Sequence, residues 1–497
     1  MSITRRNLPP NSSVFNQNRD DYDDAMTPAA HLRCIRASCA ATFESTSPRY
    51  DCERCGSLLD VAYDWDRLTA PGHLSFFEER YRSRNEPIDF SGVWRFRELL
   101  PFAPPEALVT VGEGQTLLQT PDVKRLDLPL QNGRLHFQYE GMNPSGSFKD
   151  NGMAAAFTMA RLLERRRVAC ASTGNTSASL AMFASLTSFA DGSPMRGIVF
   201  VGAGKIAQGK LAQALDFGAL TVQIDGDFDA CLTRIREAAD RLKLYIMNSV
   251  NPFRLEGQKA IMYRVLEGLG WEPPDWIVVP GGNLGNASAF GKAFSELKEL
   301  GLVQRMPRLA VVNAVGANTL CELYDRRGLR WNVGNWDDGL IAGHQAEMAK
   351  AGRKARTIAS AIEIGNPVNL PKALRSLDLM NGVVAEVSDD QIREEKARIG
   401  LVGFGCEPAS AASVAGLRRL IAEGTVDRDA RVVCILTGHQ LKDPAATVGY
   451  HLDADNGEAP PDRLFAGATP NRRFANRPIR VADDLDAICR AIEENDD

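Results

Sequence analysis

Short apolar runs alternate with longer amphipathic stretches between about residue 108 and residue 440. The runs are rich in valine, isoleucine and alanine, and most end at glycine or at a polar residue. They are LHFQYE (135–140), VACAS (168–172), GIVFV (197–201), LTVQID (220–225), WIVVP (276–280), LAVVNA (309–314) and VVCIL (432–436). Such runs are typical of strands buried in parallel sheets, and the stretches between them, such as 152–167 and 177–186, predict covering helices. The pattern therefore predicts an α/β fold.

The pattern is different at both ends of the chain. Residues 1–30 are polar and irregular and predict a flexible arm. A compact segment with four cysteines follows over 31–65, and residues 66–105 are partly helical up to a group of prolines. Residues 446–497 form a C-terminal extension in which a short helix is expected from about 483 to 493.

Composition and charge narrow the class of protein. The 497 residues are 44% apolar and 24% charged, as in ordinary globular proteins, and the net charge of -5 gives no reason to expect a nucleic-acid partner. No apolar run is long enough to span a bilayer. The first thirty residues contain four aspartates and no apolar core, which argues against a secretory or transit peptide. We therefore expect a cytoplasmic protein without a membrane partner.

The four cysteines near the N-terminus have a spacing found in metal sites. Cys34 and Cys39 are followed, after twelve residues, by Cys52 and Cys55 in the sequence CERCG. Four thiolates could form a closed tetrahedral zinc site, which would stabilise structure and leave no open position for chemistry. The alternative is a ribbon that has lost its metal and folds by its own contacts.

The segment NPSGSFKDNGM (143–153) carries the most chemical information. It follows a predicted strand and opens a predicted helix, so that Lys149 lies in the first helical turn. The positive end of the helix dipole disfavours the protonated amine, and a neutral amine is what an imine with an aldehyde cofactor requires. Taken alone, a solvated lysine would be the ordinary interpretation.

Three more loops at strand ends change that interpretation. STGNTSAS (172–179) could offer backbone N–H groups to a carboxylate, and its Asn175 could bond a phenolic oxygen. GGNLGN (281–286) has the glycines that let backbone N–H groups approach a phosphate. LTGHQLKDP (436–444) could place the Thr437 hydroxyl against a ring nitrogen.

In this order, these segments resemble the fold-type II pyridoxal-5′-phosphate (PLP) enzymes, and within them the threonine synthases. The narrower resemblance is carried by the segments VGEGQTLL (111–118), NPSGSFKD (143–150), GKIAQGKLAQAL (204–215), NPFRLEGQK (251–259), AIEIGNPVN (361–369), GCEPASAAS (405–413) and LTGHQLKDP (436–444). The resemblance implies a catalytic region over 66–445 made of two three-layer domains with parallel sheets and the cofactor between them. The smaller domain would be inserted at roughly 145–255. A zinc-ribbon-like segment ahead of this region is similar to a form of the family.

The resemblance also implies residue roles. Lys149 would hold the cofactor and act as acid and base, Asn175 would contact the pyridoxal oxygen, and Thr437 the ring nitrogen. The cofactor phosphate would be bound by Gly281, Gly282, Asn283, Leu284 and Gly285. The substrate, O-phospho-L-homoserine, would contact Ser145, Ser172, Thr173 and Arg254. A homodimer is expected on the same ground.

Three positions depart from the resemblance. Residue 151 is Asn where Arg is common, residue 363 is Glu where a basic residue is usual, and residue 440 is Gln where Gly is common. The first two each remove a positive charge, and we expect them to be surface changes. If either faces the substrate instead, the affinity for a phosphorylated substrate is in doubt. Two alternatives stay open: another fold-type II PLP enzyme, such as cysteate synthase or an amino-acid dehydratase, and a silent protein that binds phosphorylated ligands.

Overall fold

The computed structural model describes residues 29–46, 48–172, 174–202, 208–225, 228–452 and 472–495. The chain divides into two compact units. The N-terminal unit comprises Met1–Glu113, Lys149–Ile206 and Leu211–Ala260, and the C-terminal unit comprises Gly114–Phe148, Ala207–Lys210 and Ile261–Asp497. The predicted arm over residues 1–28 lies outside the described residues.

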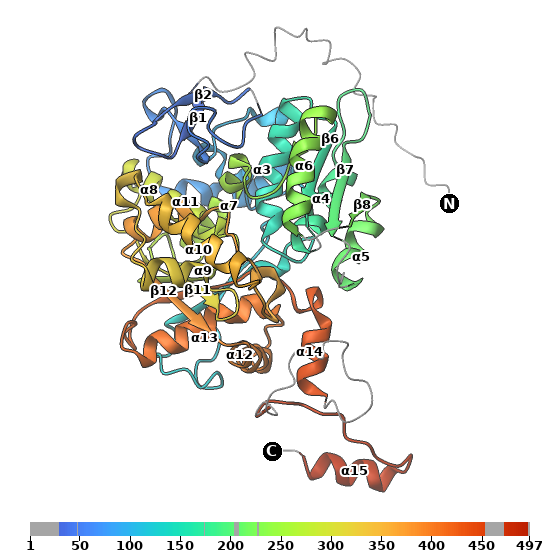
Figure 1. The fold of residues 1–497 in the computed structure, drawn as a ribbon. Coiled ribbons are helices and arrows are strands. Elements are labelled where there is room, and N and C mark those ends of the chain that lie inside the picture. The colour runs from blue at the N-terminus through green and yellow to red at the C-terminus, as the bar shows by residue number, and fades with distance from the viewer. Residues whose placement is uncertain are drawn as a thin grey trace. The chain divides into compact units, whose positions relative to one another are not determined.

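The N-terminal unit is built around a four-stranded parallel sheet in the order β8-β7-β6-β9 (Figure 1). Its strands are β6 (Arg167–Ala171), β7 (Arg196–Gly202), β8 (Leu220–Ile224) and β9 (Tyr245–Ile246). Its helices are α3 (Lys149–Leu162), α4 (Asn175–Leu186), α5 (Gln208–Asp216), α6 (Phe228–Leu242) and the first half of α7 (Pro252–Gly268). The helix predicted over 152–167 ends earlier, because Glu164 has a left-handed φ of 51° that breaks the helix before β6.

A small antiparallel sheet, in the order β2-β1-β3, precedes this α/β part. It consists of β1 (Ala30–Cys34), β2 (Thr42–Glu44) and β3 (Leu59–Tyr63). Hydrogen bonds of two tyrosine hydroxyls connect this sheet to the rest of the N-terminal unit. The Tyr63 hydroxyl donates to Glu256 Oε2 at 2.8 Å, and the Ile246 N–H donates to the Tyr50 hydroxyl at 2.7 Å.

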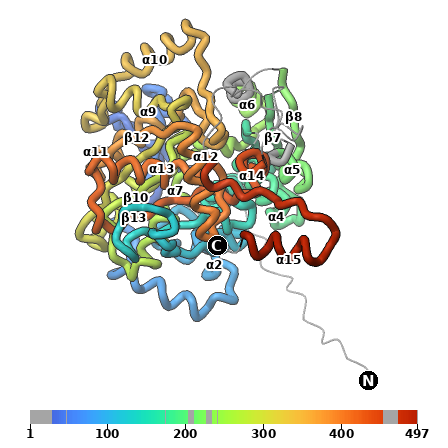
Figure 2. The backbone as a smooth tube through the Cα atoms, turned by 90° about the horizontal axis from the view of Figure 1, so that it is seen from below, coloured from blue at the N-terminus to red at the C-terminus, as the bar shows by residue number. Residues whose placement is uncertain are grey.

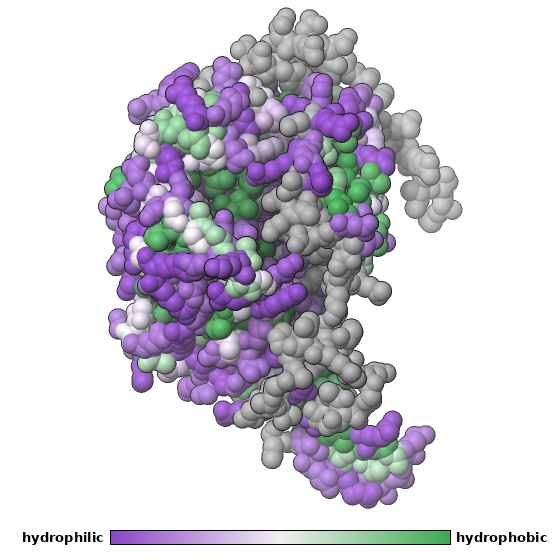
Figure 3. Space-filling model, viewed as in Figure 1, coloured by the Kyte–Doolittle hydropathy of each residue, from purple (hydrophilic) through white to green (hydrophobic). Residues whose placement is uncertain are grey.

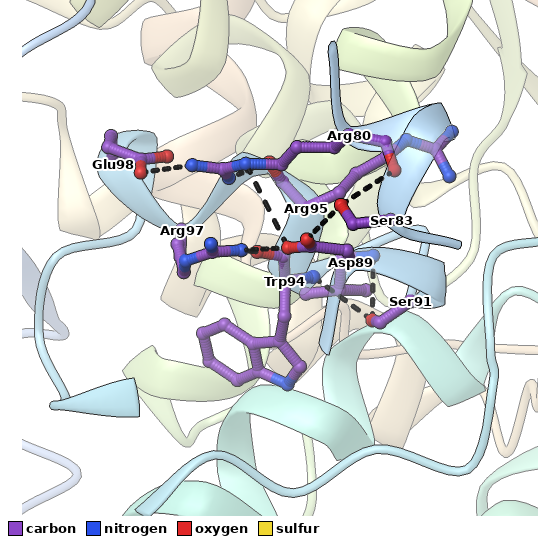
Figure 4. A network of polar contacts seen from close by, with 9 residues as sticks. Arg80, Ser83, Asp89, Ser91, Trp94, Arg95, Arg97 and Glu98 are labelled. Atoms are coloured by element: carbon purple, nitrogen blue, oxygen red, sulfur yellow. Dashed lines mark hydrogen bonds and ion pairs between the residues drawn. The ribbon is translucent and has the colours of Figure 1, made fainter. Parts of the chain in front are cut away.

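Short helical turns joined by polar contacts follow this sheet. They are η1 (Trp65–Arg67), η2 (Leu74–Ser83), α2 (Pro87–Phe90), η3 (Trp94–Leu99) and η4 (Pro105–Ala107). Asp89 is the centre of the network in Figure 4, where it accepts hydrogen bonds from Arg97 and Ser83. Arg80 donates to Glu98 and to the Arg95 carbonyl. These ionic contacts stabilise a segment whose turns are too short to be stable alone.

The C-terminal unit contains a six-stranded sheet in the order β12-β11-β10-β13-β5-β4, parallel except for β4. The strands are β4 (Leu118–Gln119), β5 (Leu135–Tyr139), β10 (Trp276–Pro280), β11 (Arg308–Ala314), β12 (Val383–Val387) and β13 (Val432–Leu436). Its longer helices are α8 (Gly285–Glu299), α10 (Asp338–Lys350), α11 (Leu370–Leu379), α12 (Asp389–Leu401) and α13 (Pro408–Ala422). Figure 2 shows β10, β12 and β13 beside α13, whose small residues, such as Ala411 and Ala412, are fully buried in the core.

Short elements complete the C-terminal unit: η5 (Glu140–Met142), α9 (Thr319–Cys321), η6 (Glu322–Arg326), η7 (Asn332–Gly334), η8 (Ser360–Ile362), η9 (Gln440–Lys442), α14 (Pro444–His451) and α15 (Leu485–Glu493). The helix expected near the C-terminus is present as α15. It carries exposed apolar side chains, among them Leu485 and Ile492. Figure 3 shows apolar surface on this helix. Among the described helices, none is both long enough and apolar enough to cross a membrane.

The predicted α/β fold with parallel sheets is confirmed, and every strand named from the apolar runs is present within one residue at each end. The sequence pattern missed β12, whose central Glu386 interrupts the apolar run VVAEV. It also missed the two-residue strands β4 and β9, which are too short to show a pattern.

Candidate active site

The turn ahead of Lys149 is held against the loop that follows β13. The Phe148 N–H donates to the Thr437 carbonyl at 2.9 Å, and the His439 N–H donates to the Gly146 carbonyl at the same distance. Gly146 has a φ of +81°, and a Cβ there would lie 3.1 Å from Lys442 Cε, so a glycine suits this position. The structure thus brings together two motifs from distant parts of the sequence. Lys149 follows as the first residue of α3 and is half-buried.

Within the N-terminal unit, α3 lies in close contact with two other helices. A Cβ at Gly257 of α7 would come within 2.0 Å of the Asn151 carbonyl oxygen, so the two backbones touch. On the other side, the Ser179 hydroxyl of α4 donates to the buried carboxylate of Asp150 at 2.5 Å. The residue next to Lys149 is therefore fixed by a charge-assisted hydrogen bond.

The loop after β6 leads directly into α4. The Gly174 N–H donates to Ser172 Oγ at 3.1 Å, and Asn175 is the first residue of the helix, with 7% of its surface exposed. The first N–H groups of a helix have no partner within the helix and can bind an anion. Thr173, predicted beside them, lies outside the described residues.

Arg254 is a buried cation near the start of α7. Its Nη1 donates to the Met247 carbonyl at 2.8 Å, whereas Nε and Nη2 have no hydrogen-bond partner among the described residues. Burial lowers the pKa of Arg254 to about 10, which still leaves it charged at neutral pH. Because only 1% of Arg254 is exposed, water does not compensate for the two open donors. An anion bound there would satisfy both.

The glycine-rich loop lies between β10 and α8 in the C-terminal unit. A Cβ at Gly281 would lie 2.7 Å from Asn313 Nδ2, and one at Gly282 would lie 3.1 Å from the Ala361 carbonyl. Larger residues would therefore disturb the backbone of this loop. Leu284, with a left-handed φ of 63°, turns the chain into α8, which begins at Gly285. Glycines at a helix start form a cradle suited to a phosphate.

Other segments of the C-terminal unit support this loop. Asn283 accepts a hydrogen bond at Oδ1 from the Val368 N–H at 3.3 Å, and its carbonyl accepts one from Asn369 N–H at 3.2 Å. The predicted motifs GGNLGN and AIEIGNPVN are therefore in contact. Ser145, predicted to bind the substrate, is completely buried in the turn before Lys149.

Thr437 has partners that the sequence did not suggest. Its hydroxyl donates to Glu407 Oε1 at 3.2 Å and lies 3.1 Å from Ser410 Oγ. Both partners belong to the motif GCEPASAAS, which gave a family resemblance but no residue roles. No signal in one sequence pairs Glu407 with Thr437, because their contact depends on β13 and α13 being neighbours in the fold.

The structure corrects one expectation about the three positions that depart from the family pattern. Asn151 is completely buried on α3, so it is not a surface change. Glu363 is part of an ion pair with Arg356 at 3.5 Å, and 29% of its side chain is exposed. Gln440 packs where a Cβ at Gly405 would lie 2.4 Å from its carboxamide carbon, so the glycine makes room for the larger side chain.

The four N-terminal cysteines lie close together. Their sulfurs are all within 4.8 Å of one another, with Cys34–Cys55 at 3.5 Å and Cys39–Cys52 at 3.7 Å. Four sulfurs bound tetrahedrally to zinc would be about 3.8 Å apart. Burial raises the pKa of Cys55, but hydrogen bonds from Ser57 and Cys34 outweigh it and lower that pKa to about 6.

Comparisons with known proteins identify the family of this chain. Residues 109–438 match the family described as "Pyridoxal-phosphate dependent enzyme". Threonine synthase of Methanocaldococcus jannaschii is 37% identical over 463 residues, which are 93% of this chain and 99% of that protein. Threonine synthase of Methanosarcina acetivorans is 39% identical over 84% of this chain and 93% of its own length.

A solved structure extends the comparison to the fold. Threonine synthase from Escherichia coli superimposes with a TM-score of 0.57 at 18% identity, covering 94% of this chain and 100% of that one. The resemblance drawn from the motifs is confirmed by the curated relatives. The chain therefore belongs to the threonine synthases, within the pyridoxal-phosphate dependent enzymes.

Proposed function

We propose that this chain converts O-phospho-L-homoserine and water to L-threonine and phosphate, with PLP held covalently by Lys149. The observation that carries the choice of substrate is Arg254, a buried cation with two N–H donors that have no hydrogen-bond partner among the described residues. A substrate phosphate would satisfy those donors. The substrate of an amino-acid dehydratase has no phosphate group that could bind the Arg254 donors, so a dehydratase is the weaker candidate.

The residues present fit PLP. The loop from Gly281 to Gly285 would offer backbone N–H groups to the cofactor phosphate. Its course needs glycine at positions 281 and 282, because side chains there would collide with Asn313 and with the Ala361 carbonyl. Asn175 would hold the phenolic oxygen, and Thr437 the ring nitrogen. When bound, the cofactor supplies an electron sink for the carbanions of the reaction.

Side chains of the protein would bind the substrate and transfer its proton. Ser172, Thr173 and the first N–H groups of α4 would bind the substrate carboxylate, while Arg254 and Ser145 orient its phosphate. The Lys149 amine, in its neutral form, would take the proton from Cα and return it later. The Ser179–Asp150 hydrogen bond fixes the first turn of α3, so this amine acts from a constant position.

The cysteine cluster has a separate role. We infer that Cys34, Cys39, Cys52 and Cys55 hold a structural zinc ion, because their sulfur separations are close to those of a tetrahedral site. Zinc content of the purified protein, measured against a Cys52→Ser variant, tests this role. On the family resemblance we also propose a cytoplasmic homodimer, which light scattering after size exclusion would test.

The decisive assay follows phosphate and threonine together after the protein and PLP are mixed with O-phosphohomoserine. Equal release of both supports the proposal. Phosphate without threonine would indicate elimination by a related enzyme and contradict it. If neither product appears but borohydride fixes PLP on Lys149, the cofactor site stands and phosphoserine, the substrate of cysteate synthase, is tried next.

A further inference from the structure

The carbonyl that orients Arg254 belongs to Met247, directly after strand β9. Met247 is completely buried, and its carbonyl accepts the hydrogen bond from Arg254 Nη1 at 2.8 Å. The Met247 N–H donates to the Ala169 carbonyl of β6 at 2.8 Å, so the sheet holds this backbone from one side. A guanidinium is planar and rigid, so the position of the Met247 carbonyl sets the direction of Arg254 Nε and Nη2.

Tyr50 holds the same backbone from the other side. Successive N–H groups of a strand point to opposite sides, so the Ile246 N–H points away from β6. Because β9 is the edge strand of the sheet among the described residues, the Tyr50 hydroxyl takes the place of a neighbouring strand and accepts this N–H at 2.7 Å. Ile246 is 2% exposed, so water has little access to replace the hydroxyl. The Tyr50 ring also lies 6.0 Å from the ring of Tyr245, the first residue of β9.

Tyr63 holds the helix that carries Arg254. Its hydroxyl donates to Glu256 Oε2 at 2.8 Å, and Glu256 lies two residues after Arg254 on α7. This carboxylate is buried, so its hydrogen bond to Tyr63 is shielded from water. The cysteine-bearing segment over 31–65 therefore contacts the backbone on both sides of Arg254, through Tyr50 before it and through Tyr63 after it. All of these residues belong to the N-terminal unit.

We propose that the cysteine-bearing segment supports the substrate site, with Tyr50 and Tyr63 as positioning residues that direct Arg254 Nε and Nη2 toward the substrate phosphate. This inference rests on the proposed role of Arg254 in phosphate binding. Neither tyrosine touches the substrate, so the effect passes through the protein backbone. A displacement of the Met247 carbonyl by about 1 Å would turn the guanidinium and weaken its charge-assisted hydrogen bonds to an anion.

The test compares Tyr50→Phe and Tyr63→Phe with the unchanged holoenzyme. Each substitution removes one hydroxyl and keeps the ring. We expect KM for O-phosphohomoserine to rise by about tenfold in Tyr50→Phe and by about threefold or more in Tyr63→Phe, whereas kcat changes less than about twofold. The dissociation constant for inorganic phosphate, measured by calorimetry on the holoenzyme, should rise by the same factors because both ligands use Arg254. The affinity for PLP should stay the same.

Two controls separate positioning from a general effect on the fold. Tyr450→Phe removes a hydroxyl that also accepts a backbone N–H, that of Phe474 at 3.3 Å in the C-terminal unit, and should leave KM and phosphate affinity unchanged. The second control uses Arg254→Met as the background. Without the guanidinium there is no group for Tyr50 to position, so adding Tyr50→Phe should raise KM no further. A merely structural role of Tyr50 would raise KM equally in both backgrounds.

The outcomes distinguish this inference from the proposed function. An unchanged phosphate affinity in either tyrosine variant overturns the inference, even if the unchanged protein forms threonine. Effects of Tyr50→Phe and Arg254→Met that multiply in the double variant overturn it as well. If Arg254→Met itself leaves KM and phosphate affinity unchanged, the proposed role of Arg254 fails and the inference fails with it. If the unchanged protein forms no threonine, the proposed function fails, and the phosphate affinities alone decide the inference. If Tyr50→Phe does not fold, the same measurements on Tyr63→Phe, alone and with Arg254→Met, decide.

Discussion

Replacing Lys259 by methionine would break a completely buried ion pair. Lys259 Nζ lies 2.7 Å from Glu256 Oε2 on the same helix, and the side chains are 0% and 1% exposed. Nζ also donates to the Leu99 carbonyl at 3.3 Å and lies 5.1 Å from the ring centre of Tyr63. Tyr63 in turn donates to Glu256, so this cluster joins the cysteine-bearing sheet to α7.

The structure sets the size of the effect. Removing one partner of a buried pair leaves an uncompensated charge and costs about 3–5 kcal/mol. Methionine keeps most of the side-chain volume, so the loss comes mainly from the charge. The matched control is Arg234→Met, which breaks a pair of the same i,i+3 spacing at 2.6 Å, with side chains 65% and 56% exposed. An exposed pair contributes about 0–1 kcal/mol.

Urea unfolding followed by tryptophan fluorescence measures the difference. With a denaturant slope of about 3 kcal/mol per molar, the midpoint of Lys259→Met should fall by roughly 1 M or more, and that of Arg234→Met by a few tenths at most. An equal fall in both variants would refute the reasoning.

The loss of folding stability in Lys259→Met should also depend on pH. Without Lys259, burial raises the pKa of the Glu256 carboxyl above its unfolded value. A carboxyl with a raised pKa destabilises the fold increasingly as pH rises above the unfolded value, so the loss should be larger near about pH 8 than near about pH 5. A penalty that grows toward acid pH would contradict the buried-charge explanation.

Four further changes test other parts of the molecule. Lys149→Ala should abolish threonine formation and borohydride fixation of PLP without moving the urea midpoint by more than a few tenths of a molar; substantial activity would remove Lys149 from the reaction. Arg254→Met should raise KM for the phosphorylated substrate about 10- to 100-fold, since charge-assisted hydrogen bonds contribute about 1.5–3 kcal/mol, with little change in PLP affinity; an unchanged KM would exclude Arg254 from phosphate binding. Removing zinc with a chelator should lower the unfolding temperature of the unchanged protein but not of Cys52→Ser, and equal curves before and after chelation would indicate a metal-free ribbon. Burial raises the pKa of Asp89, but hydrogen bonds from Ser83 and Arg97 outweigh this effect and hold the pKa below its usual value. The ionised Asp89 carboxylate therefore stabilises the folded state above about pH 4, and this contribution is lost as pH falls further. Asp89→Asn should therefore be less stable than the unchanged protein at neutral pH and equal to it in strong acid; a gap that persists in acid would contradict this ionic role.

The sequence by itself determined the local parts of this protein. Apolar runs such as WIVVP (276–280) and VVCIL (432–436) predict buried strands because side-chain burial repeats within a few residues. The motifs after them place glycines and hydroxyls at strand ends, where parallel sheets carry their binding loops. The proposed cofactor residues and the four cysteines can therefore be named from the sequence alone.

Only the tertiary structure decided which distant segments touch. Glu407 lies behind Thr437 because α13 packs beside β13, and the pairing of Glu256 with Tyr63 needs the N-terminal sheet to dock on α7. Asn151 was expected at the surface, yet the close approach of α3 to α7 at Gly257 buries it. Local periodicity shows which face of an element is buried but not against which neighbour. That choice depends on strand order and helix packing, which are set by the energy of the whole fold.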